Sequence, residues 1–152
     1  MSYDNEKQVA EKAAQMLTVA MRSKIGSLGF KHHISSGAKK SISEALGDYK
    51  GKDFTTEDGR AIYYLNKITL QMERHGFIQH YGDQGTRKGG ERTRTKPRNT
   101  TYTFRTHEWN LPSRDYIDDA IKQSGVIPFV MENVTKLRGE EIMVYLKNFL
   151  EK

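Results

Sequence analysis

Cysteine is absent from this sequence of 152 residues. Disulfide bonds, thiolate nucleophiles and zinc sites built on cysteine are therefore excluded. No apolar run approaches the roughly 18 residues that a membrane-spanning helix needs. Residues 1–8 are polar and acidic, unlike the basic and then apolar start of a secretory signal. We therefore expect a protein without a membrane anchor, located in the cytoplasm.

Motifs that carry catalysis or metal binding are also missing. The histidines are scattered, and neither a His-Glu-x-x-His pair nor a Gly-x-Ser-x-Gly nucleophile motif occurs. The adjacent His32 and His33 would point to opposite faces of a strand, so they would not bind one ion together. Residues 36–41 lack the spacing of a phosphate-binding loop. We predict a binding protein with no catalytic residue, metal or cofactor, and a nuclease is the enzymatic alternative.

Positive charge is the most distinctive property that the sequence does have. The chain contains 25 lysines and arginines against 19 acidic residues, which gives a net charge of +6. Residues 82–98 alone hold six basic and two acidic side chains, together with four glycines and one proline. A cationic segment with no apolar residue does not build a core. It predicts contact with a polyanion such as nucleic acid.

Apolar spacing predicts three helices in the first half of the chain. Residues 4–28 repeat apolar side chains at three- and four-residue steps, and the same pattern recurs over 36–46 and 55–75. Residues 30–34 have the aromatic and β-branched ends of a short strand. Residues 47–54 are rich in glycine, aspartate and lysine and predict a loop.

The basic segment is expected to join two strands. Residues 77–81 form a strand-like run with Phe77, Ile78 and Tyr81, and residues 100–105 alternate aromatic side chains with threonine and arginine. The connection between them, residues 82–99, is long for a loop in a compact domain, and such loops are usually functional. In its second half the basic residues stand at every second position, so in an extended chain Arg92, Arg94, Lys96 and Arg98 would all project from one side.

The last forty residues have a helical and more apolar character. A helix is expected over residues 113–123, a buried connector over 126–131, and a final helix over 133–151 that Gly139 would interrupt. These helices have more apolar surface than a pair of helices buries alone. We therefore expect them to form a homodimer through residues 113–151 or to dock a protein partner.

The order helix, strand, helix, helix, strand, long wing, strand resembles a winged helix-turn-helix domain. The resemblance covers about residues 5–106, with 41–47 as the second helix, 55–74 as the recognition helix and 81–101 as the wing. We therefore expect a mostly helical α+β fold. It comprises a winged-helix domain over residues 1–110 and a C-terminal helical extension over 111–152.

The resemblance implies that the helix over 55–75 enters the major groove of double-stranded DNA. The wing, residues 82–99, would lie on the backbone or in the minor groove. The expected contact residues carry side chains that hydrogen-bond to phosphates or base edges. They are Lys39, Lys40, Arg60, Tyr63, Asn66, Lys67, Gln71, Arg74, Arg87, Lys88, Arg92, Arg94, Lys96 and Arg98.

The sequence thus predicts a DNA-binding protein that regulates transcription, associated with the nucleoid if the host is a bacterium or its phage. An alternative is an accessory protein of a polymerase or replication complex that docks its partner through the C-terminal helices. A third possibility is an RNA-binding module, because a basic segment alone does not distinguish the two nucleic acids.

Overall fold

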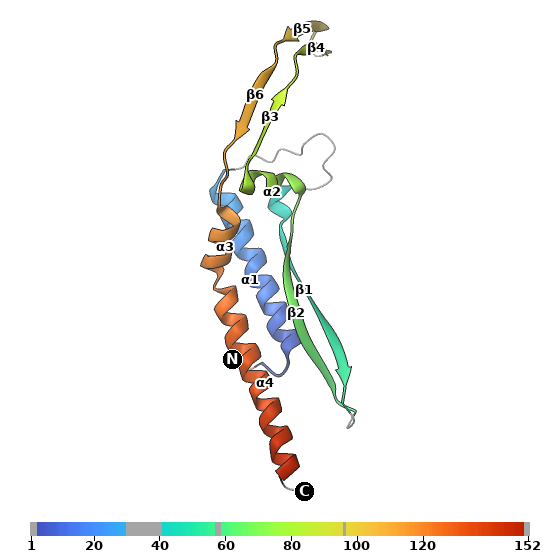
Figure 1. The fold of residues 1–152 in the computed structure, drawn as a ribbon, viewed down its shortest axis with the longest axis vertical. Helices are drawn as coiled ribbons and strands as arrows, with labels where there is room; N and C mark the ends of the chain where they lie inside the picture. Colours follow the sequence, from blue (N-terminus) through green and yellow to red (C-terminus); the bar gives the residue numbers. More distant parts are fainter. Residues whose placement is uncertain (1–2, 30–40, 57–58, 96, 151–152) are drawn as a thin grey trace. The chain divides into compact units, whose positions relative to one another are not determined.

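The computed structural model describes an α+β fold with helices and two-stranded antiparallel ladders (Figure 1). The described residues are 3–29, 41–56, 59–95 and 97–150. The α+β class predicted from the sequence is confirmed. The predicted strand over 30–34 and the lysines Lys39, Lys40 and Lys96 lie outside the described residues.

The chain divides into two compact units. We call residues 1–73 with 116–152 the body, and residues 74–115 the arm. The division differs from the expected boundary at residue 110. The C-terminal helices pack against the N-terminal helix in the same unit and do not form a separate extension.

Helix α1, Glu6–Ser27, is the centre of the body. Its start is capped by Asn5, whose side chain accepts a hydrogen bond from the Gln8 amide at 3.0 Å. Figure 1 shows α1 between the β1–β2 hairpin and the helices α3 and α4. The predicted helix over residues 4–28 is confirmed. Its buried apolar face consists of Val9, Ala10, Ala13, Ala14, Leu17, Met21 and Ile25.

The predicted second helix over residues 36–46 is wrong for its described part. Ser41 forms a capping box with Glu44, but only the single 3-10 turn η1, Ile42–Glu44, follows it. Strand β1, Leu46–Thr55, then occupies the segment 47–54 that was expected to be a loop. The chain turns into a strand here because β1 finds a partner for its backbone hydrogen bonds in β2.

The predicted recognition helix over 55–75 is also wrong. Residues Ala61–Gln71 form strand β2, antiparallel to β1. A β-bulge leaves Asn66 unpaired, because Gly51 pairs with Leu65 while Lys50 pairs with Lys67. The extra residue brings Leu65 and Ile68 to the same side, where both line one groove. Their three-residue spacing therefore imitates the period of a helix.

The β1–β2 hairpin touches α1 directly with its backbone. At Gly47 a Cβ atom would lie 2.3 Å from the carbonyl oxygen of Ala14, which is closer than atoms can approach. The Gly47 amide donates to the Thr18 hydroxyl at 2.8 Å, and that hydroxyl donates to the Ala14 carbonyl at 2.8 Å. Gly47 therefore permits the close packing of strand on helix.

An ion pair joins α1, β2 and α4 at one place in the body. The Glu6 carboxylate is buried, and it accepts hydrogen bonds from Arg138 Nε at 2.5 Å and Arg138 Nη2 at 3.1 Å. It also accepts from the Leu65 amide at 2.6 Å, beside the bulge. These bonds with Glu6 raise the pKa of the Arg138 guanidinium above its ordinary value. We call these three residues the Glu6 clamp.

Two helices complete the body. Helix α3, Tyr116–Ser124, overlaps the helix predicted over 113–123 and ends one residue later, and burial raises the pKa of Tyr116 to about 12. Helix α4, Val126–Leu150, is uninterrupted at Gly139 and includes the segment 126–131 that was expected to be a connector. Pro128 is tolerated because it stands in the first turn, where the amide has no helical acceptor.

The arm begins with a helix where a strand over residues 77–81 was expected. Helix α2, Arg74–Tyr81, ends at Gly82, which has the positive φ of 77° that suits a residue after a helix. A five-residue segment with only a few apolar side chains does not distinguish a strand from a short helix. The strand prediction was wrong because this glycine acts as a helix stop.

Two ladders follow α2 and form the rest of the arm. Strand β3, Asp83–Arg87, pairs with β6, His107–Leu111, and strand β4, Gly90–Arg94, pairs with β5, Thr100–Phe104. The predicted strand over 100–105 is confirmed, but its partner is β4. Most of the expected wing loop, residues 82–99, is therefore β structure. It supplies β3 to one ladder and β4 to the other.

Candidate nucleic-acid interface

The net charge of the protein is concentrated in the arm. Residues 74–115 contain nine lysines and arginines and four acidic residues, so the arm carries a net charge of +5. The body, with more than twice as many residues, carries only +1. The positive potential that attracts a polyanion therefore arises mainly from the arm.

The β4–β5 ladder has two chemically different faces. Arg92 pairs with Tyr102 and Arg94 with Thr100, so these side chains share one face. The other face carries Glu91, Thr93, Thr101 and Thr103, and the hydroxyls of Thr93 and Thr101 are 3.0 Å apart. The register thus puts the cations and the single carboxylate of this ladder on opposite sides.

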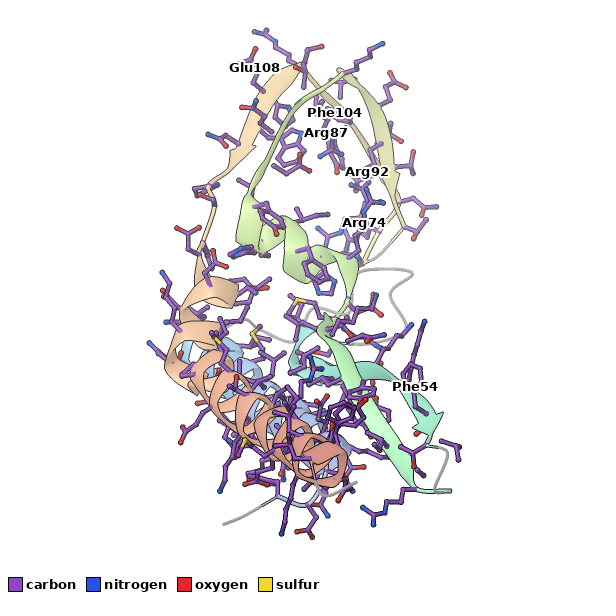
Figure 2. All side chains as sticks on the ribbon, turned by 60° about the horizontal axis from the view of Figure 1, so that its bottom comes forward. Phe54, Arg74, Arg87, Arg92, Phe104 and Glu108 are labelled. Carbon is purple, nitrogen blue, oxygen red and sulfur yellow. The ribbon has the colours of Figure 1, made fainter. Side chains whose placement is uncertain are left out.

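The cationic face continues into the β3–β6 ladder. Between the ladders each strand has a two-residue break, and Gly89 in one break donates its amide to the hydroxyl of Thr106 in the other at 2.9 Å. The Arg87 guanidinium lies 4.6 Å from the centre of the Phe104 ring, which brings a β3 side chain and a β5 side chain to one side. In Figure 2 Arg87 and Arg92 lie on the inner side of the arm, whereas Glu108 points away from them.

We call this side the Arg face. Its cations lie on β3 and β4, and its aromatic side chains lie on the partner strands β5 and β6. They are Arg87, Arg92, Arg94, Tyr102, Phe104 and Trp109. The exposed fraction is 45% for Tyr102 and 41% for Trp109, so both rings are accessible to a ligand.

Two hydrogen bonds between His80 and Arg114 close the base of the arm. His80 of α2 is buried, and its Nδ1 donates to the carbonyl oxygen of Arg114 at 3.0 Å. The Arg114 amide donates in return to the His80 carbonyl at 2.9 Å. This pair of contacts joins the entry and the exit of the arm, so the ladders are anchored at their base. His80 has a structural position and is not among the exposed ligand-binding groups.

The structure separates the predicted DNA-binding residues into two groups. Arg87, Lys88, Arg92, Arg94 and Arg98 all belong to the arm and are exposed there. Arg74 begins α2 at the base of the same unit. The first five were predicted from the charge of the basic segment and Arg74 from the expected recognition helix, and all six belong to one unit.

The second group lies on or beside β2 and does not share one face. Arg60 is in the turn before the strand, and Gln71 donates to the Asp48 carboxylate at 2.8 Å. Tyr63 is half-buried and contacts Tyr49 edge to face, and burial together with the charge of Asp53 raises its pKa. Asn66 and Lys67 are exposed at the bulge. The expected common face is wrong because the helix that would create it is a strand.

The aromatic members of the Arg face were missed as ligand contacts. The alternation of Tyr102 and Phe104 with threonine predicted a half-buried strand. Their register partners are Arg92 and Gly90, which belong to a segment with no core to cover them. The signal was available in the sequence, since aromatic residues stood in a strand next to a run of arginines.

A separate cavity lies in the body. It has a volume of about 540 Å³ and is lined mainly by apolar side chains of β2 and α4, including Leu65, Ile68, Val130 and Val134. Across the described ranges, no group of three histidine, cysteine or acidic side chains is placed to hold a metal ion. None of the described helices is long and apolar enough to cross a membrane.

Comparisons with known proteins were made at three levels. No family model matches the chain, and neither the curated proteins nor the solved structures gave a match.

Proposed function

We propose that the protein is a non-catalytic module that binds the sugar-phosphate backbone of a nucleic acid with its arm. The observation that supports this most is the segregation of charge on the two ladders. Arg87, Arg92 and Arg94 share one face, while Glu91 and Glu108 belong to the other. Guanidinium groups on an extended ribbon match the repeated negative charges of a phosphate backbone.

Of the two DNA-contacting parts that the winged-helix resemblance implied, only the wing is part of this proposal. The recognition helix is not. The wing, residues 82–99, contains β3 and β4, whereas the segment expected in the major groove is strand β2. Such a module could serve in the regulation of transcription or as an accessory protein of a polymerase or replication complex. Binding through phosphates provides affinity without sequence selectivity.

Salt dependence is the direct test of this proposal. We expect the affinity for a labelled oligonucleotide to fall linearly on a log–log plot, with a slope of about −0.7 to −0.9 for each phosphate neutralised. Fluorescence anisotropy over a series of potassium chloride concentrations measures it. A protein that binds neither DNA nor RNA at low salt would contradict the proposal.

A second candidate function, self-association, is favoured by the exposed end of α4. Apolar side chains there recur at three- and four-residue steps and form a strip along one side of the helix. The strip consists of Ile142, Tyr145, Leu146, Phe149 and Leu150, with exposed fractions between 46% and 80%. Figure 1 shows this end of α4 extending beyond α1, and we propose that a second copy of the chain covers it.

Charge along α4 favours an antiparallel pair of these helices. The exposed end begins with Glu140 and Glu141 and has Lys147 near its finish. An antiparallel arrangement brings the acidic part of one copy near the basic part of the other, and a two-fold axis makes the contact reciprocal. The expected homodimer would thus use the second half of α4 and not the whole of residues 113–151.

Substitutions in the strip test this dimer without removing the helix. We expect Tyr145→Glu and Phe149→Glu each to weaken self-association about tenfold or more, since burial of one large apolar side chain contributes about 1.5–3 kcal/mol. Sedimentation velocity over a concentration series measures the change. Glu132→Lys, on an exposed part of the same helix outside the strip, is the control. A monomeric wild-type chain at high concentration would contradict the dimer.

A further inference from the structure

The Arg face combines cations with aromatic rings, and the opposite face does not. Tyr102 stands across the ladder from Arg92. On the opposite side of the described β4–β5 ladder are Glu91 and the threonines Thr93, Thr101 and Thr103, with no aromatic ring. Contact with phosphates alone needs only cations and hydroxyl groups. The rings therefore require an additional explanation.

The two rings on β5 are in different situations. Phe104 is half-buried, with the Arg87 guanidinium 4.6 Å from its ring centre. The residue across from it is Gly90, where an added Cβ atom would meet the Phe104 ring at 3.8 Å. Phe104 is thus held by neighbours in the arm. Tyr102 is 45% exposed, and its ring is the better placed of the two for an external planar group.

Unpaired bases are the planar groups that accompany a phosphate backbone. In a duplex each base is stacked between its neighbours and paired, so its face is not available to a protein side chain. In a single strand a base can stack on an aromatic ring while cations hold the adjacent phosphates. Arg92 and Arg94 are about 6.8 Å apart along β4, a spacing that lets both contact the backbone of one strand.

We propose that the arm prefers single-stranded nucleic acid to duplex, with a base stacked on Tyr102 and phosphates bound by Arg92 and Arg94. This inference rests on the proposed function and specifies the class of nucleic acid. The Arg87 guanidinium, 4.6 Å from the centre of the Phe104 ring, provides a further cation on the same face. The preference arises from the bases and not from their sequence, because each base has a face to stack.

The experiment compares three ligands of equal length and one protein variant. The ligands are a labelled thymidine single strand of about 15 nucleotides, an abasic strand with the same phosphates, and a duplex. We expect the wild type to bind the thymidine strand about tenfold more tightly than the other two. Tyr102→Ala should lose this preference and leave the affinity for the abasic strand and the slope against salt unchanged.

Two further variants separate stacking from other effects. Tyr102→Phe keeps the ring and should bind the thymidine strand within about twofold of the wild type. Loss of the ring in Tyr102→Ala should instead lower this affinity about tenfold. Thr103→Ala, the neighbour on the opposite face, should also bind normally. Circular dichroism checks that all variants fold alike.

The outcomes distinguish this inference from the proposed function. Equal wild-type affinity for all three ligands, or an equal loss for all three in Tyr102→Ala, would overturn the single-strand preference and leave backbone binding intact. Failure to bind any of the three at low salt would overturn both.

Discussion

Removal of the arginines from the arm should lower the affinity for nucleic acid by on the order of 10³-fold at about 0.1 M salt. The variant replaces four exposed side chains with alanine, namely Arg87, Arg92, Arg94 and Arg98. Each phosphate contact that is lost should reduce the log–log slope by about 0.7 to 0.9. The slope should therefore become shallower by about three, which anisotropy at several salt concentrations measures.

A control variant of equal charge separates the arm from a general effect of net charge. Four exposed lysines of the body are replaced with alanine: Lys7, Lys12, Lys122 and Lys136. Both variants change the net charge by the same amount. We expect the body variant to keep nearly the whole slope. If the two variants lose affinity equally, binding depends on overall charge and the arm is not the contact surface.

Removal of the cation from the Glu6 clamp should have the largest effect on stability. In Arg138→Met the apolar stem remains, but the buried Glu6 carboxylate keeps only the Leu65 amide among its clamp partners. A buried charge without its counterion is costly. Because Arg138 itself is 47% exposed, we expect a loss of about 2–3 kcal/mol in the free energy of unfolding. Urea unfolding measures it.

The pair of Lys24 and Asp119 provides the matched comparison. Its atoms are 3.0 Å apart, but the Asp119 side chain is 50% exposed. Lys24→Met should therefore cost less than about 1 kcal/mol. Adding Glu6→Gln to Arg138→Met should recover part of the stability, since the amide oxygen still accepts from Leu65 and carries no charge. A loss in Arg138→Met no greater than in Lys24→Met would contradict the clamp.

Local signals are sufficient for α1 and β5 and insufficient for β2. In α1 the apolar spacing and the cap at Asn5 agree, so sequence and structure coincide. In β2 the bulge at Asn66 depends on the register in which this strand pairs with β1. Nothing in the local pattern reveals the extra residue, and Leu65 and Ile68 consequently have helical spacing. Helix α2 was missed because Gly82 can be recognised as a helix stop only when the residues before it are known to be helical.

The interface was predictable in its charges and not in its geometry. Arg92 and Arg94 were expected on one side from alternation alone, and the β4 register agrees. The contact between Arg87 and Phe104 was not predictable, because it depends on a break in both strands that changes the alternation. Long-range pairing thus determines which rings accompany which cations.

The body is assembled from chain segments on both sides of the arm, so the arm is an insertion in sequence. Contacts of α1 with α3 and α4, together with the Glu6 clamp, connect the segment before residue 74 to the segment after 115. A protease that cleaves at the exposed Arg98 would yield two peptides that remain associated as one folded body. For the same reason, residues 74–115 could be exchanged for another β-hairpin without removing a helix or strand of the body.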